Sequence, residues 1–171
     1  LKYATNTPGI WAIDSILDSG GNVGLYTSLA LSVNLSGDAV VHISYIDSTN
    51  HRLKYVTNAS LEWVAAAVDS AGDVGQFGAL AVDPSGNAHV GYYDVINKTL
   101  KYATNGSGSW VATVVDNAGD VGRYASLAVD GAGKVHISYF DLANDDLKYA
   151  TKATSTSAWV PITVPDPAAA N

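Results

Sequence analysis

Three histidines recur at one position of the sequence, and histidines at a fixed spacing are candidate metal ligands. They lie 47 residues apart, and each begins a run of alternating apolar and polar residues. Three imidazoles that point to one axis would bind a transition metal through nitrogen. The spacing also places them in separate copies of a repeated unit, which favours structural histidines bonded between units. The three are His42, His89 and His136, and a fourth, His51, is expected in a solvated loop.

Two short acidic loops resemble calcium-binding segments. They run over residues 69–73 and 116–120, and each has an aspartate at both ends. They lack the Asp-x-Asp-x-Asp-Gly run that places an oxygen at every second residue. We favour turn aspartates that accept backbone N–H groups. The weak calcium candidates are Asp69, Asp73, Asp116 and Asp120.

One tryptophan stands at a fixed position in each copy of the repeat. Exposed indole rings would form stacking platforms for sugars. Aromatic side chains at a constant strand position are more often packed between repeated units, and we favour that interpretation. The tyrosine of the recurring Leu-Lys-Tyr triplet is interpreted in the same way. The tryptophans are Trp11, Trp63, Trp110 and Trp159.

Four Asn-x-Ser/Thr sequons fall in segments that read as loops, where a glycan acceptor must lie. Roughly half as many matches would arise by chance. Successive loops of an antiparallel sheet alternate between its two ends, which places three of these loops on one face and the fourth on the other face with most of the aspartates. The protein is therefore expected to have a sugar-rich face and an acidic face. The glycosylation candidates are Asn34, Asn58 and Asn105 on the first face and Asn97 on the second.

No nucleophile elbow, Walker loop, dinucleotide fingerprint or zincin motif occurs in the sequence. The adjacent Asp145 and Asp146 are interpreted as a solvated turn, because neighbouring side chains in a strand or loop point apart. We assign no catalytic residue and expect no cofactor.

The amino-acid composition limits the kinds of molecule that the protein could bind. The formal charge is −7, with 9 Lys and Arg against 16 Asp and Glu, so nucleic acid and anionic membranes are disfavoured. No apolar run is long enough to cross a bilayer. The absence of cysteine excludes disulfides and thiolate metal sites. The absence of methionine indicates a processed chain or a piece of a longer one.

The repeat itself predicts the architecture. Leu-Lys-Tyr begins at residues 1, 53, 100 and 147, and the segments between show period-2 alternation bounded by Asp- and Gly-rich turns. A repeat length in the forties of residues, in which the segments show the alternation of β-strands, is typical of propeller blades. We predict an all-β β-propeller of about four blades at 1–166, with a half blade at 1–18, blades at about 26–69, 77–116 and 124–166, and a tail at 167–171.

The half blade poses a physical problem, because a two-stranded ribbon is marginal in water and leaves an open edge. We expect it to pack against residues 149–164 of the same ring, or to pair with strands of a neighbouring copy. Two chains of three and a half blades could also close one seven-bladed ring.

The phrase at residues 126–139, SLAVDGAGKVHISY, resembles blades of secreted propeller-repeat proteins of bacteria and archaea, related to the NHL and sialidase-type repeat groups. The sialidase Ser-x-Asp-x-Gly-x-Thr-Trp box and an arginine cluster are missing. The resemblance implies a propeller outside the cell or on its surface, often in tandem. We expect a non-enzymatic structural module of a surface layer or filament that binds copies of itself. The alternative is a carbohydrate-binding, lectin-type propeller.

Overall fold

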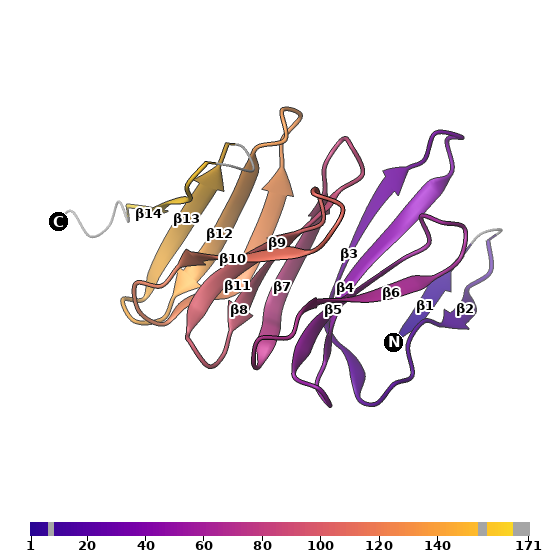
Figure 1. The fold of residues 1–171 in the computed structure, drawn as a ribbon, viewed down its shortest axis with the longest axis horizontal. Helices are drawn as coiled ribbons and strands as arrows, with labels where there is room; N and C mark the ends of the chain where they lie inside the picture. The colour runs from indigo at the N-terminus through magenta and orange to yellow at the C-terminus, as the bar shows by residue number, and fades with distance from the viewer. Residues whose placement is uncertain (7–8, 154–156, 166–171) are drawn as a thin grey trace.

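The computed structural model describes residues 1–6, 9–153 and 157–165. Within them the chain forms three four-stranded antiparallel sheets and one two-stranded sheet (Figure 1). We call the four-stranded sheets blades 1, 2 and 3, and the two-stranded sheet the half blade. The strands of a blade are lettered A to D in chain order, and the half blade corresponds to C and D. No helix that could span a membrane is found in the described part of the chain.

The strand bounds follow the repeat. The half blade contains β1 (Lys2–Thr5) and β2 (Ala12–Ile16). Blade 1 contains β3 (Val23–Val33), β4 (Ala39–Asp47), β5 (Arg52–Thr57) and β6 (Val64–Asp69). Blade 2 contains β7 (Val74–Val82), β8 (Ala88–Asp94), β9 (Thr99–Thr104) and β10 (Val111–Asp116). Blade 3 contains β11 (Val121–Val129), β12 (Val135–Asp141), β13 (Asp146–Lys152) and β14 (Val160–Thr163).

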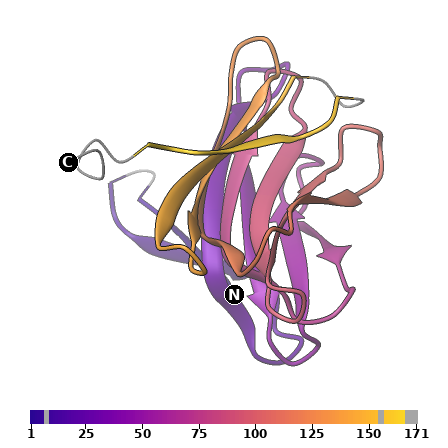
Figure 2. The ribbon, with the colours of Figure 1, turned by 90° about the vertical axis from the view of Figure 1, so that its left-hand side faces the viewer.

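The sheets stand side by side with their A strands in the centre. β3 contacts β7, and β7 contacts β11. In the turned view of Figure 2 the orange and yellow sheet of blade 3 lies in front of the others. The prediction of an all-β propeller of about four blades is thus confirmed. The array is open, because the half blade and blade 3 lie at its opposite ends (Figure 1).

The A strands are longer than the sequence predicted. In blade 3 the run of small and apolar residues over 126–129 predicts a short strand A, whereas β11 begins at Val121. The extra residues contain a bulge, with Gly122 at φ +108° and Tyr124 at φ +52°. Gly122 is required there, because an added Cβ would lie 2.7 Å from the Cα of Leu100 in blade 2. A glycine and a left-handed aromatic residue therefore concealed the start of the strand.

The half blade is supported in a way the sequence did not predict. It packs on blade 1, with Leu1, Tyr3 and Leu17 against the cluster that contains Ile43 and Tyr45. The terminal ammonium of Leu1 donates to the backbone oxygen of Asp18 at 2.8 Å. The expected packing against residues 149–164 is wrong, because the described strands of that range, β13 and β14, lie at the other end of the array (Figure 1). The half blade instead makes with blade 1 the kind of contact that blades 1 and 2 each make with the blade after them.

Candidate functional site

A buried group of polar side chains joins blade 1 to blade 2. The Tyr92 hydroxyl, from strand B of blade 2, donates to Oδ2 of Asp69 at the end of blade 1, at 2.6 Å. The Lys101 ammonium pairs with the same oxygen and lies 3.9 Å from Oδ2 of Asp94. Oδ1 of Asp69 accepts the Ala71 N–H at 2.9 Å. All of these charged side chains are buried, so the group holds the two blades together by paired charges inside the protein.

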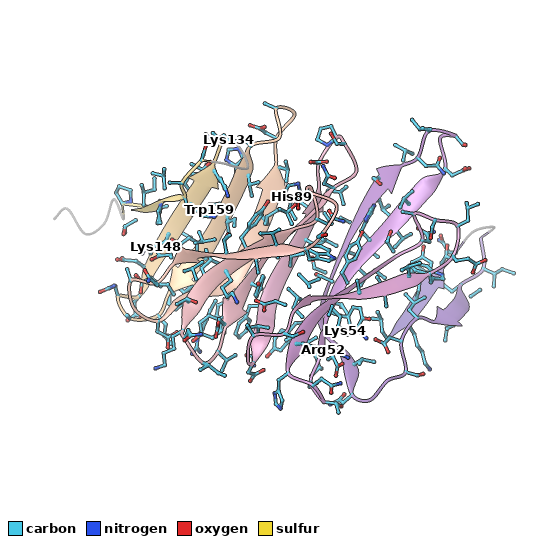
Figure 3. All side chains as sticks on the ribbon, in the orientation of Figure 1. Arg52, Lys54, His89, Lys134, Lys148 and Trp159 are labelled. Atoms are coloured by element: carbon cyan, nitrogen blue, oxygen red, sulfur yellow. The ribbon has the colours of Figure 1, made fainter. Side chains whose placement is uncertain are left out.

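The same group recurs at the other two junctions. At each one, an aspartate at the end of strand D or just after it accepts a tyrosine hydroxyl from strand B and a lysine ammonium from strand C of the next blade. The acceptor distances are 2.7 Å for Tyr139 and 2.5 Å for Lys148 on Asp116, and 2.8 Å for Tyr45 on Asp18. Lys54 completes the Asp18 group. Figure 3 labels Lys54 in blade 1 and Lys148 in blade 3.

This arrangement accounts for two of the weak calcium candidates. Asp69 and Asp116 do accept turn N–H groups, as predicted, and their remaining oxygens accept lysine and tyrosine. Asp73 lies 3.5 Å from His51, and Asp120 accepts the Tyr93 hydroxyl at 2.7 Å. Among the described residues, no three histidine, cysteine or acidic side chains gather where they could hold a metal ion.

Sequence reasoning missed the lysine and the tyrosine of the junction. The lysine lies 32 residues after its aspartate in both complete junctions. That constant separation is the one signal that could have revealed the pair. Because the two residues belong to different blades, the sequence of a single repeat does not reveal their contact.

The junction controls the ionisation of its members. Burial would raise the pKa of the Asp18 carboxyl, but hydrogen bonds from Lys54, Gly20 and Tyr45 and the charge of Lys54 together lower it to about 2. The pKa values of Asp69 and Asp116 are lowered in the same manner, against burial. Burial and the neighbouring carboxylate raise the pKa of the Tyr92 hydroxyl far above its usual range.

These lowered pKa values predict sensitivity to acid. A carboxyl whose pKa is lower in the folded state stabilises it fully above its unfolded pKa, and this stabilisation is lost as pH falls toward the folded pKa. For Asp18 the window runs from 3.8 down to about 2. We expect the free energy of unfolding, measured by denaturant titration, to fall as the pH falls across this window. The Asp18→Asn variant should show a smaller dependence of this free energy on pH. A free energy of unfolding that does not change between pH 4 and pH 2 would contradict the assignment.

The histidines are structural, but they bond within blades and not between them. Nδ1 of His89 lies 2.5 Å from the Tyr102 hydroxyl of strand C in the same blade, and Nε2 lies 3.3 Å from Asp83. The cause is the register: Gly91 pairs with Tyr102, so His89 is the diagonal neighbour of that tyrosine on one face. The other two histidines bond in the same way, His42 to Tyr55 and His136 to Tyr149, each at 2.5 Å.

Three of the four tryptophans, Trp63, Trp110 and Trp159, pack between blades, as predicted, although they are half-buried and not fully enclosed. Each packs on the Leu-Lys-Tyr tyrosine of the preceding sheet. Centroid distances are 5.3 Å for Tyr3 and Trp63, 5.1 Å for Tyr55 and Trp110, and 4.9 Å for Tyr102 and Trp159. Trp159 is labelled in Figure 3.

The two ends of the array lack this contact. Trp11, in the half blade, is 73% exposed. At the other end, Leu147 of blade 3 is 53% exposed, whereas its counterparts Leu53 and Leu100 are buried by the next blade. A hollow of about 400 Å³ opens beside Leu147. Each end thus presents one half of a junction that the interior of the molecule completes.

A second hollow, also of about 400 Å³, lies between blades 2 and 3 on the A–B loop side. Its wall includes Tyr102, Thr113 and Lys152. The Thr113 hydroxyl is buried without a hydrogen-bond partner, and the Lys152 ammonium lies 5.7 Å from the centre of the Trp159 ring. The hollow therefore combines an aromatic wall with a cation.

The sequons occupy turns and strand ends. Asn97, in the B–C turn of blade 2, is exposed and donates to Oδ2 of Asp94 at 2.9 Å. Asn58 and Asn105 are half-buried, and their side-chain oxygens accept the backbone N–H of Val41 and Ala88. Asn34, in the A–B loop of blade 1, accepts two loop N–H groups.

No protein-family model matches the chain, and no curated protein is significantly similar to it. Among solved structures, the chain is similar to a fucose lectin from Kordia zhangzhouensis, determined in complex with methyl-fucoside. The TM-score is 0.56 at 16% sequence identity, and the match covers 81% of this chain and 99% of the lectin chain. At this identity the likeness concerns the fold, and it agrees with the blade architecture.

Proposed function

We propose that the chain is a non-enzymatic structural repeat module of an extracellular or cell-surface assembly, joined to copies of itself end to end. The observation that supports this most directly is Trp11. Its three counterparts each pack on a tyrosine of the preceding sheet, whereas Trp11 is 73% exposed. Among the described residues, Tyr149 is the one Leu-Lys-Tyr tyrosine on which no tryptophan packs. Trp11 of one copy on Tyr149 of the next would repeat the internal contact.

When two different surfaces of a molecule bind each other in separate copies, each added copy leaves one surface free to bind the next. Such head-to-tail contacts form closed rings if the rotation per subunit closes, and open filaments if it does not. The exposed leucine at residue 147 adds an apolar area next to Tyr149. These features support a filament or surface-layer subunit over an isolated monomer.

The assembly predicts a concentration-dependent mass. We expect light scattering on the purified chain to show species larger than one 17.7 kDa chain as concentration rises, and Trp11→Ala to shift this transition to at least tenfold higher concentration. Ile96→Ala, a matched change of an exposed residue in the B–C turn of blade 2, should leave it unchanged. A strictly monomeric chain at millimolar concentration would contradict the proposal.

The extracellular location predicts N-linked glycans. In protein from its native source we expect intact mass spectrometry to show added hexose mass on at least one of the four sequons, with Asn97 favoured because its side chain is exposed. Asn→Gln variants made in the native host would assign the position. A native protein with the bare polypeptide mass would contradict glycosylation, whereas material from an ordinary bacterial host is no test.

Carbohydrate binding is the second candidate, favoured by the hollow between blades 2 and 3 and by the likeness in fold to a fucose lectin. Tyr102 and Lys152 would supply an aromatic wall and a charged donor for sugar hydroxyls. A glycan array, read with and without free sugar, tests it. Lys152→Ala should abolish sugar-inhibited binding, and Lys98→Ala, an exposed lysine on the opposite side of the blade, should retain it.

A further inference from the structure

One position of the repeat changes its residue type at the hollow between blades 2 and 3. Asn58 and Asn105 follow strand C of blades 1 and 2, and the corresponding residue of blade 3 is Lys152. Each asparagine oxygen accepts a backbone N–H from strand B of its own blade. A lysine side chain has no acceptor and cannot make this bond. The Lys152 ammonium lies instead 5.7 Å from the centre of the Trp159 ring, so that blade 3 carries a cation where blades 1 and 2 carry a neutral amide.

Lys152 differs from the other strand C lysines of the blades in having no acidic partner. Each of those lysines pairs with an aspartate at a junction; they are Lys54, Lys101 and Lys148. Among the salt bridges between described residues, none includes Lys152. Its side chain is half-buried and lies over the face of Trp159, which attracts a cation but does not neutralise it. Lys152 therefore retains a positive charge that a ligand could pair.

The hollow has one acidic residue among the described residues of its wall, and the carboxylate of that residue is already saturated. Oδ1 of Asp83 accepts the backbone N–H groups of Ser85 and Asn87 at 2.8 and 2.9 Å. Oδ2 accepts the Asn87 side-chain amide at 2.9 Å and lies 3.3 Å from Nε2 of His89. These four partners occupy the acceptor sites of both oxygens. Lys152 is thus the charged group of the wall that still lacks a partner.

The remainder of the wall is aromatic, apolar and hydroxylated. The Tyr102 side chain, on which Trp159 packs at 4.9 Å between centroids, lines the hollow together with the side chains of Thr104 and Ser107. The Ser107 hydroxyl donates to the Ser109 carbonyl at 3.2 Å and keeps its acceptor sites for a ligand hydroxyl. A volume of about 400 Å³ is in the range of small-molecule sites. A sugar ring, with apolar C–H groups on its faces and hydroxyls around its edge, matches this wall.

We propose that the hollow between blades 2 and 3 binds a sugar residue that carries a negative charge, with its anionic group at Lys152 and its ring against Tyr102. The inference rests on carbohydrate binding, the second candidate function, and names the class of sugar. A hydrogen bond between two charged groups is stronger than one between neutral groups, so an anionic sugar gains affinity at Lys152 that a neutral sugar does not. Figure 3 labels His89, which lines the hollow from blade 2, and Trp159, whose ring lies beside Lys152 in blade 3.

Titration of the intact chain with matched sugars tests the site. Glucuronate, a glucose sulfate, glucose and acetate are added separately to isotope-labelled protein, and the indole N–H signal of Trp159 is followed by NMR. We expect a saturable shift with at least one anionic sugar at a concentration about tenfold below that which glucose requires, the gain for a hydrogen bond to a charged group. The tighter of the two anionic sugars identifies a carboxylate or a sulfate as the preferred group. Acetate should bind more weakly than either, because it lacks the sugar ring.

Three variants separate the charge of Lys152 from its other contacts. Lys152→Gln keeps N–H donors but removes the charge, so its affinity for the anionic sugar should fall to that for glucose. Lys152→Arg keeps the charge and should retain the preference. Lys98→Gln is the matched control, because it changes the net charge equally at a lysine whose side chain is 61% exposed and pairs with Asp120. Equal losses in Lys98→Gln and Lys152→Gln would overturn the proposal.

The same titrations judge the carbohydrate candidate separately. If glucose binds as tightly as both anionic sugars, the hollow is a sugar site without charge selection, which overturns the inference and upholds the candidate. If acetate binds as tightly as the anionic sugars, the hollow binds anions without recognising sugar, and the inference fails. If no sugar gives a saturable shift, both fail. The hollow lies within one chain, so dilute monomer is used and the end-to-end assembly is not at issue.

Discussion

Replacement of Lys101 with methionine should destabilise the protein by about 3–5 kcal/mol, the range for breaking a buried pair by removal of one partner. Methionine fills the space of the lysine stem but removes the charge. The Asp69 carboxylate then loses its ammonium partner while it remains buried, and Asp94, at 3.9 Å, loses a second favourable charge. The free energy of unfolding from denaturant titration measures the effect.

Lys2 provides the matched control. It occupies the same position of the same Leu-Lys-Tyr triplet, but its side chain is exposed in the half blade. Lys2→Met should therefore change the free energy of unfolding by no more than about 0.5 kcal/mol, as is usual for surface substitutions. Asp69→Asn added to Lys101→Met should recover part of the loss, because it removes the unpaired charge. Equal effects at the two lysines would show that the buried junction contributes little.

The blade architecture was predictable because it depends on local, repeated features. Four copies of Leu-Lys-Tyr, a period in the forties and Asp-Gly turns define strands and connections without any long-range information. The start of the A strands was not predictable in this way. Gly122 looks like a turn residue, yet together with Tyr124 it forms a bulge, and Leu100 of the neighbouring blade approaches Gly122 too closely for any other residue to fit there.

The candidate site was harder to predict from the sequence than the fold. The prediction that the junction aspartates accept backbone N–H groups in turns was correct, but their lysine and tyrosine partners come from another blade. Whether His89 would bond to its own blade or to the next depended on the register of β8 and β9, which a single sequence does not fix. The open ends were inferred from a strand count. Which surfaces they expose, such as Leu29 and Leu147, required the three-dimensional packing of β3 and β11.

Replacement of Trp110 with alanine is the second large effect that we expect. A buried tryptophan changed to alanine costs about 3–5 kcal/mol, and a half-buried ring should cost about 2–3 kcal/mol. Trp110 lies edge-on to Tyr55, 5.1 Å between centroids, and packs on the cluster between blades 1 and 2. Its removal therefore uncovers apolar side chains of both blades.

Trp11→Ala is the natural comparison, because the same residue type stands at the same repeat position with 73% of its surface exposed. In dilute, monomeric protein it should alter the free energy of unfolding by less than about 0.5 kcal/mol. At concentrations where copies associate, the wild-type chain should gain stability from the new contact, whereas Trp11→Ala should not. A large loss for Trp11→Ala in the monomer would show that this ring already packs within its own chain, and the end-to-end contact would then lose its principal support.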